Sequence, residues 1–337
     1  MNNKDEKIDF VITWVDGNDP KWLEERNHYA ALECRDIDNN NARFRDWDML
    51  RYWFRGVEEF APWVNKIFFV TYGHLPEWLN TNHPKLVVEK HEDFIPTQYL
   101  PTFNSQLIEF NFCNIKNLSE KFVYFNDDMF LLDSVKPERF FKDGLPCDLG
   151  GMEVMGHSRP DIFDSTIFLA TALINKHFDK KTAIRKNLSK WYTLKYPGIT
   201  SNNFRLRRLN KFPGFMMNHF PQGYLKHTYE EVWNHCGDDL KRMYLNKFRS
   251  YGDVCIWLLR YWQLASGNFI PYNIYKDGMY FNIQDDNIEE ISNMIIQQKK
   301  KLICLNDTSV KMDFENNKKK IISAFERILP NKCSFEL

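Results

Sequence analysis

Short apolar runs alternate with amphipathic stretches along the first 147 residues. The apolar runs are rich in β-branched and aromatic side chains, which is typical of buried strands, and they lie at 8–15, 66–72, 85–90 and 121–125. Stretches with helical spacing or a capping signal separate them, at 21–34, 46–60 and 104–114. This alternation of strand and helix predicts an α/β fold with a doubly wound, Rossmann-like sheet.

The pattern changes beyond about residue 147. Helices are expected at 161–178, 221–247, 251–266, 287–298 and 314–329. A basic, aromatic and loop-rich stretch covers 186–217, an extended segment 269–283 and a short strand 301–305. We therefore expect an α/β core (1–147), a mostly helical second lobe (148–268), and a C-terminal α/β segment (269–337) that packs back on the core.

Composition narrows the functional class. The 337 residues carry 45 Lys and Arg against 45 Asp and Glu, which argues against a polybasic nucleic-acid binder. No stretch reaches the roughly 18 to 20 apolar residues of a membrane span. The first residues lack the layout of a signal peptide, and the seven cysteines have no C-x-x-C pair or metal-ligand spacing. We expect a cytoplasmic protein with reduced thiols and no bound nucleic acid.

Two acidic turns follow predicted strands. Asp16 comes after the first strand, and Asp127 and Asp128 come directly after 121–125. The carboxyl ends of parallel strands share one edge of a sheet, where ligand groups gather. Carboxylate oxygens suit Mg²⁺ or Mn²⁺, so we expect a divalent cation at Asp127 and Asp128. A turn or helix cap without a metal is the alternative.

Other charged residues have two interpretations each. Three arginines, Arg43, Arg45 and Arg51, surround Asp46 and Asp48 at a predicted helix start. They form either a self-neutralised surface cluster or a site where one guanidinium binds a phosphate. His219 precedes a predicted helix, where its imidazole serves either structure or general-base catalysis.

Two further clusters lie in the second half of the chain. Arg249 and Asp253 flank a turn that opens an apolar helix, and a capped helix end would also explain them. A basic stripe is interleaved with aromatic residues; it is a solvated face or a contact for an acidic glycan, a phospholipid surface or a donor phosphate. The stripe consists of Phe204, Arg205, Arg207, Arg208, Lys211 and Phe212.

Four strings in the first 132 residues carry a family resemblance. They are IDFVITWVDGNDP (8–20), RFRDWDMLRYWFRGVEEFAPWVNKIFFVTYGHLPEWLN (43–80), LPTFNSQLIE (100–109) and LSEKFVYFNDDMFLL (118–132). They resemble the first two conserved regions of the Stealth family, the sugar-1-phosphate transferases of bacterial capsule and exopolysaccharide synthesis. That family is similar to the catalytic part of the animal lysosomal-enzyme GlcNAc-1-phosphotransferase. MNHFPQGYLK (217–226) and KFRSYGDVCIWLLRYW (247–262) resemble its third and fourth regions, and KLICLND and ILPNKCSFEL its C-terminal end.

The resemblance implies a glycosyltransferase-A-like, donor-binding core and a defined reaction. A hydroxyl of an acceptor glycan attacks the phosphorus next to the sugar of a UDP-sugar, UMP leaves, and a phosphodiester forms. It implies Asp127 and Asp128 as ligands of Mg²⁺ or Mn²⁺. It also implies Arg45 and Arg249 at the phosphates, and His219 or Asp16 as the base, with His219 favoured. The substrate-binding residues carried over are Trp14, Gly17, Arg43, Asp46, Asn104, Ser105, Glu109, Asn126 and Asp253.

Two rival functions remain open. An ordinary metal-dependent glycosyltransferase would use the same acidic pair but release UDP, and a non-catalytic carbohydrate-binding protein would use the aromatic residues, 16% of the chain, to stack on sugars. For the transferase, we expect a glycan acceptor that is free or lipid-linked. We expect no membrane span, and at most peripheral contact at the inner face of the plasma membrane.

Overall fold

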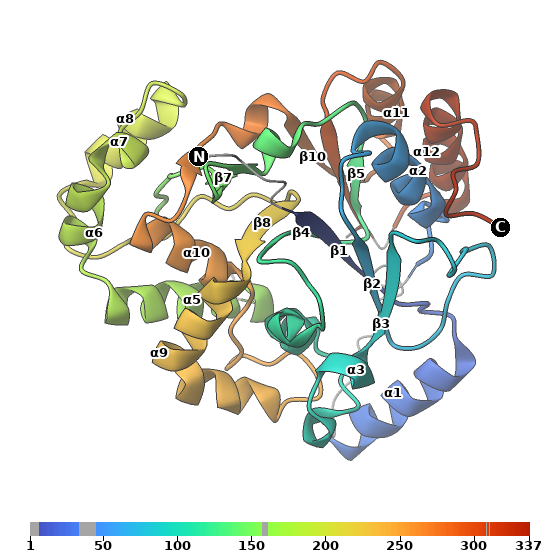
Figure 1. The fold of residues 1–337 in the computed structure, drawn as a ribbon, viewed down its shortest axis with the longest axis horizontal. Helices are drawn as coiled ribbons and strands as arrows, with labels where there is room; N and C mark the ends of the chain where they lie inside the picture. Colours follow the sequence, from blue (N-terminus) through green and yellow to red (C-terminus); the bar gives the residue numbers. More distant parts are fainter. Residues whose placement is uncertain (1–6, 34–44, 157–160, 308, 310) are drawn as a thin grey trace.

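A five-stranded sheet forms the centre of the computed structural model (Figure 1), which describes residues 7–33, 45–156, 161–307, 309 and 311–337. The strand order is β3-β2-β1-β4-β8. The first four strands run parallel: β1 (Ile8–Trp14), β2 (Ile67–Thr71), β3 (Leu86–Lys90) and β4 (Lys121–Phe125). The predicted α/β fold class and the four predicted strands are confirmed.

Side chains of the central strands alternate between two apolar layers, as the pleat requires. In β1, Phe10 and Ile12 pack into one buried cluster, and Val11 between them packs into the other. Both faces of the sheet are therefore covered, which is why these strands are almost entirely apolar.

The first apolar layer is covered by α2 (Leu50–Phe60), α11 (Ile288–Ile296), α12 (Phe314–Ile328) and a second sheet in the order β10-β11-β5. Its strands are β5 (Met129–Leu131), β10 (Gly278–Asn282) and β11 (Leu302–Asn306). Since β11 pairs antiparallel with β5, the C-terminal segment packs directly on the core.

The second layer is covered by helices that gather on the opposite side in Figure 1. They include α4 (Ser105–Phe110), α5 (Ile162–His177), α9 (Lys226–Tyr244) and α10 (Trp257–Ser266). The remaining helices are α1 (Pro20–Leu32), α3 (His91–Phe94), α6 (Lys180–Lys186), α7 (Leu188–Trp191) and α8 (Pro197–Leu206). A third small sheet joins β6 (Phe141–Lys142), β7 (Leu145–Asp148) and β9 (Ile270–Pro271).

Several predicted boundaries were wrong. The predicted helix 221–247 begins with a strand, β8 (Gln222–Leu225), which pairs antiparallel with β4. The stretch 186–217 contains α7 and α8 and is less irregular than its composition indicated. The predicted helices 46–60 and 251–266 start only at Leu50 and Trp257, and 104–114 is divided into α4 and a short 3₁₀ turn. The start of α1 is as expected: the Asp19 side chain accepts a hydrogen bond from the Trp22 backbone amide, and Pro20 is the first residue of the helix.

A buried ion pair ties the helical lobe to the third sheet. The guanidinium of Arg260 on α10 forks onto Asp148 of β7, with nitrogen–oxygen distances of 2.8 and 3.0 Å. Both side chains are almost completely excluded from solvent. The pairings of β8 with β4 and of β11 with β5 likewise cross the expected boundaries near 147 and 268. The three-part division itself remains a prediction.

Within the described ranges, no helix combines the length and apolar character that crossing a bilayer requires. The six cysteines in these ranges are free thiols, and all but Cys113 are buried.

Candidate active site

Strand direction explains why the candidate residues meet at one edge of the central sheet. β1 and β4 are parallel, with Ile12 opposite Phe125, so the turns that carry Asp16 and Asp127 leave the sheet on the same side. β8 is antiparallel to β4, with Gln222 opposite Tyr124. The residues just before β8 therefore lie beside those just after β4.

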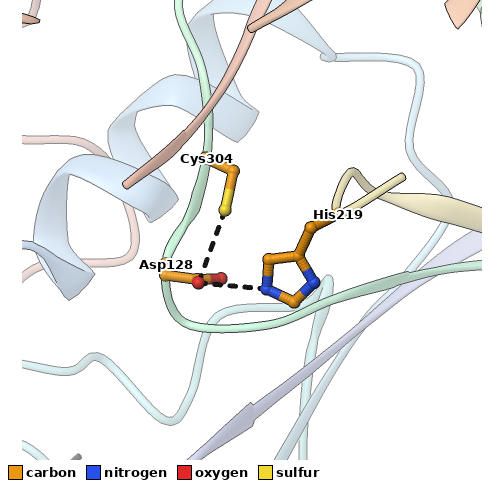
Figure 2. Close-up of side chains that lie close together, drawn as sticks. All are labelled: Asp128, His219 and Cys304. Carbon is orange, nitrogen blue, oxygen red and sulfur yellow. Dashed lines mark hydrogen bonds and ion pairs between the residues drawn. The ribbon is translucent and has the colours of Figure 1, made fainter. Parts of the chain in front are cut away.

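This arrangement brings His219 onto Asp128 (Figure 2). Nε2 of His219 is 3.1 Å from Oδ2 of Asp128. It is also 3.4 Å from Nδ2 of the Asn126 side chain. On the other side, β11 pairs with β5 so that Cys304 is opposite Met129. Its thiol donates to the same Oδ2 over 3.4 Å. Residues from three distant segments thus surround one carboxylate.

The electrostatics of this group depend on Asp128. Burial alone would lower the pKa of His219, but the hydrogen bond and the charge of Asp128 outweigh it and raise that pKa above its ordinary value. The side chain of Asp127 is exposed, but many protein atoms surround its carboxyl group. Desolvation by these atoms is the larger cause and the charge of Asp128 the second cause that raise its pKa to about 7. Burial raises the pKa of the Cys304 thiol well above its ordinary value, so this thiol is neutral.

The group fits a divalent cation. Oδ1 of Asp128 is buried and has no hydrogen-bond partner among the described residues, which is costly unless something else satisfies it. Ligand atoms of Asp128, His219 and Cys304 lie within 4.8 Å of one another. A ligand set of carboxylates and an imidazole suits Mn²⁺ better than Mg²⁺, because Mg²⁺ prefers oxygen ligands alone. A neutral thiol is a poor ligand for either ion.

A second group lies around the start of α4 and the segment 246–253. The Asn104 side chain caps α4 through the Gln106 amide and donates to Asp253 over 2.8 Å. Asp253 also accepts from Asn246 and from the Ser250 amide, so it holds the turn before α10 in place. The Arg249 guanidinium reaches Ser105 Oγ at 2.5 Å. Asn104, Ser105, Arg249 and Asp253 are therefore brought together.

Glu109 connects the two groups. Its buried carboxyl accepts from Tyr124 of β4 over 3.2 Å, and that hydroxyl lies 3.1 Å from Thr13 of β1. Burial raises the pKa of Glu109 to about 7. The charge of Arg249 is the largest effect that lowers this pKa, and the charge of His219 also lowers it. Both cationic groups therefore act on one buried carboxyl.

A cavity of about 340 Å³ opens beside the strand ends. Trp14, Asp16 and Asp46 line it together with Asp48, Leu50, Arg51, Leu75, Pro76, Glu77 and Trp78. Gly17 is buried in the turn after Asp16, whose amide donates to Nε2 of His74 over 2.7 Å. Desolvation raises the pKa of Asp46, and the charge of Asp46 in turn contributes to the raised pKa of Asp127. The cavity and the acidic pair thus lie close together.

Arg45 is engaged elsewhere. Its guanidinium forks onto Asp307, after β11, with distances of 3.1 and 2.8 Å, and it also donates to the Ser309 carbonyl. The Trp47 indole donates to the same carboxylate. Arg45 therefore neutralises a carboxylate in this structure. Arg43 lies outside the described residues.

The sequence did not single out Cys304, Tyr124, His74 or Asp307. Cys304 and Tyr124 occupy apolar strands, where a thiol and a phenol look like ordinary core residues. His74 and Asp307 follow β2 and β11. Their positions at strand ends, the criterion that drew attention to Asp16 and Asp127, were the available signal.

Comparisons with known proteins identify the class. Residues 6–31 match Stealth protein CR1, conserved region 1, and residues 43–147 match Stealth protein CR2, conserved region 2. A protein of Streptococcus pneumoniae named capsular polysaccharide phosphotransferase WcwK is 42% identical over 98% of both chains. The exopolysaccharide phosphotransferase cps2G of Lactiplantibacillus plantarum is 39% identical, over 98% of this chain and 96% of its own. The receptor polysaccharide phosphotransferase WefC of Streptococcus gordonii is 36% identical, over 98% of this chain and 99% of its own.

The chain belongs to the Stealth family, and it aligns with these relatives along nearly its whole length. Solved structures are more distant. The bifunctional glycosyltransferase WbbM gives a TM-score of 0.41 at 11% identity, over 97% of this chain and 52% of its own. The galactosyltransferase LgtC gives a TM-score of 0.37 at 9% identity, over 94% of this chain and 95% of its own. The fold assignment rests on the sheet of this chain itself.

Proposed function

We propose that this protein transfers a sugar 1-phosphate from a UDP-sugar to a hydroxyl of an acceptor glycan in cell-surface polysaccharide synthesis. A phosphodiester forms and UMP leaves. The observation that carries the proposal is full-length similarity, at up to 42% identity, to relatives named polysaccharide phosphotransferases. Two observations support it, because phosphoryl transfer needs positioning and charge neutralisation. His219 contacts Asp128 beside Asp127, and the charges of His219 and Arg249 both act on the buried Glu109.

Asp127 and Asp128 are the proposed metal ligands, with the unsatisfied Oδ1 of Asp128 as the supporting observation. A bound Mg²⁺ or Mn²⁺ would neutralise charge on the donor diphosphate. Asn126, which contacts His219, stands next to this pair and would bind the same part of the donor.

The proton acceptor is proposed to be His219, with Asp16 as the other candidate. His219 lies at the acidic pair, whereas Asp16 lines the cavity beside the strand ends. The group closer to the attacking hydroxyl takes its proton. The remaining group would then orient the acceptor.

Arg249 is the proposed phosphate contact, since its planar guanidinium can fork onto phosphate oxygens and it lies against Ser105 at the start of α4. The contact between Ser105 and Arg249 would be held in place by neighbouring buried groups. These are the hydrogen-bonded pair Asn104 and Asp253, and the carboxyl of Glu109. Arg45 would reach a phosphate only after it releases Asp307 and the Ser309 carbonyl, so we propose a contact that depends on that release. Arg43 stays a candidate from the resemblance alone.

The cavity suits a sugar better than a phosphate. Four carboxylates line it, from Asp16, Asp46, Asp48 and Glu77, against the single guanidinium of Arg51 among the described lining residues. Carboxylates accept hydrogen bonds from sugar hydroxyls and repel phosphates, while Trp14 and Trp78 offer apolar ring surface. We therefore assign Trp14 and Asp46 to the sugar and not to the diphosphate, together with Gly17 in the turn next to Asp16.

An ordinary glycosyltransferase is the alternative, and the released nucleotide separates the two. Purified protein would be incubated with an acceptor glycan and a panel of UDP-sugars, and the nucleotide product identified by chromatography. UMP supports phosphotransfer, whereas UDP establishes glycosyl transfer.

A further inference from the structure

The segment 180–217, here called the basic lobe, has an unusual charge composition. It contains ten Lys and Arg and no Asp or Glu, although the whole chain balances 45 against 45. The rest of the chain therefore carries 35 cations against 45 anions. The charge of the molecule is therefore distributed unevenly, with a positive basic lobe and a negative remainder.

Most of these cations face solvent. Lys180 is buried, where it donates to the Leu206 and Leu209 carbonyls, and Lys190 is half-buried and donates to Gly267. The eight exposed cations are Lys181, Arg185, Lys186, Lys195, Arg205, Arg207, Arg208 and Lys211. The lobe spans α6, α7 and α8, which lie together at the outer edge of the fold in Figure 1, away from β1 and β2.

Large apolar side chains are exposed in the same lobe. Of the fifteen exposed large hydrophobic residues in the described ranges, five belong to these 38 residues: Leu188, Leu194, Phe204, Leu209 and Met217. Leu194, between α7 and α8, is 92% exposed. Along α8 the exposed positions 197, 198, 201, 204 and 205 follow helical spacing, so Phe204 and Arg205 share its outward face.

We propose that the basic lobe docks this protein on an anionic lipid surface. Cations are attracted to lipid phosphates, and the exposed leucines and Phe204 enter the boundary between headgroups and acyl chains. The acidic remainder of the molecule is repelled by the same surface, so the lobe faces the bilayer. The apolar side chains favour lipid over a soluble polyanion, because a soluble polyanion offers them no hydrocarbon.

Docking there has a geometric consequence for the active site. The lobe ends at Met217, and the chain continues through Asn218 to His219 and then to β8. Tyr275 donates to the Met217 carbonyl and fixes this junction. A membrane-bound lobe would hold the His219 side of the active site near the lipid surface.

Co-sedimentation with vesicles tests the proposal. Wild-type protein is expected to bind vesicles containing phosphatidylglycerol, to bind pure phosphatidylcholine vesicles far less, and to be released by salt. In the triple variant Arg205→Gln, Arg207→Gln and Arg208→Gln, the partition coefficient should fall about a hundredfold, since each cation near the surface contributes about fivefold. Leu194→Ser with Phe204→Ser should also lower it.

A matched variant controls for total charge. Lys116→Gln, Lys299→Gln and Lys319→Gln remove three exposed cations outside the basic lobe and should bind like the wild type. Circular dichroism checks that each variant is folded. Equal binding of wild type to both vesicle types, or undiminished binding by the arginine variant, would overturn the proposal. Equally tight binding to polyglutamate, with vesicle binding unaffected in the Leu194 and Phe204 variant, would identify a general polyanion site and overturn lipid docking.

Discussion

His219 and Asp128 are 91 residues apart in the chain, yet Nε2 of the histidine lies 3.1 Å from Oδ2 of the aspartate. The contact follows from the antiparallel pairing of β8 with β4, which returns the chain to the carboxyl end of β4. An edge strand that the sequence pattern did not reveal therefore builds the centre of the candidate site.

Replacement of one carboxylate of the acidic pair by an amide should weaken cation binding. Asp127→Asn and Asp128→Asn keep side-chain shape but weaken coordination of a hard cation, so turnover should collapse while the protein stays folded. Excess EDTA should inactivate the wild type. Electron paramagnetic resonance titration with Mn²⁺ measures binding directly, and Asp286→Asn, an exposed site, is the control. Full activity in EDTA would rule out the metal role.

His219 and Cys304 both contact Asp128 but should differ in importance. His219→Ala should lower kcat by roughly 10² to 10⁴ with little change in KM for the donor, as expected for a lost general base. Cys304→Ala removes only a weak S–H donor and should cost less than about tenfold. Steady-state kinetics on both variants tests this, and equal losses would argue against the assignment of the base.

Arg249 should not be replaceable by lysine. The planar guanidinium beside Ser105 can fork onto a phosphate, whereas an ammonium is a single point charge. Arg249→Lys should lower kcat/KM by about tenfold to a hundredfold, the effect of one lost charge-assisted hydrogen bond. Arg185→Lys, on the exposed surface of α6, should leave the rate unchanged. Wild-type kinetics for Arg249→Lys would remove this residue from the site.

Glu109 should make stability depend on pH. Its pKa is about 7 in the folded protein and near 4.5 when unfolded, so the folded state binds the extra proton between these values. The free energy of unfolding should therefore fall as pH rises from about 4.5 to 7, by on the order of 3 kcal/mol, and change little from this group above that range.

Urea unfolding at several pH values measures this contribution. Glu109→Gln should make the decline smaller by this amount, because an amide keeps an acceptor for Tyr124 but does not titrate. The decline due to Asp127, whose pKa is also raised to about 7, should remain. Glu59→Gln, at an exposed position, should retain the full decline. Parallel curves for wild type and Glu109→Gln would show that this carboxyl is not perturbed.

The sequence predicted the central sheet well because its strands are short apolar runs bounded by turn residues. It missed β8 because Gln222–Leu225 is only four residues long and adjoins a 19-residue helix whose periodicity dominates the pattern. It pointed to Asp16, Asp127 and Asp128 through their places after strands. It gave no sign of Cys304, whose contact with Asp128 spans 176 residues and depends on the pairing of β11 with β5.

The resemblance and the geometry contribute different parts of the site. Asn104, Ser105, Arg249 and Asp253 were grouped only through the family strings, and the structure brings them into mutual contact around α4. Arg45 came from the same strings, but its ion pair with Asp307 is a long-range contact that local sequence does not encode.

The most direct test of the proposed reaction follows the phosphorus. A carbon-centred transferase breaks the bond between the sugar and its phosphate, whereas a phosphotransferase leaves that bond intact. UDP-sugar labelled on the sugar-side phosphorus, given with an acceptor glycan, should place the label in the glycan and release unlabelled UMP. Label found only in UDP, with a product that resists phosphodiester cleavage, would contradict the account and establish ordinary glycosyl transfer.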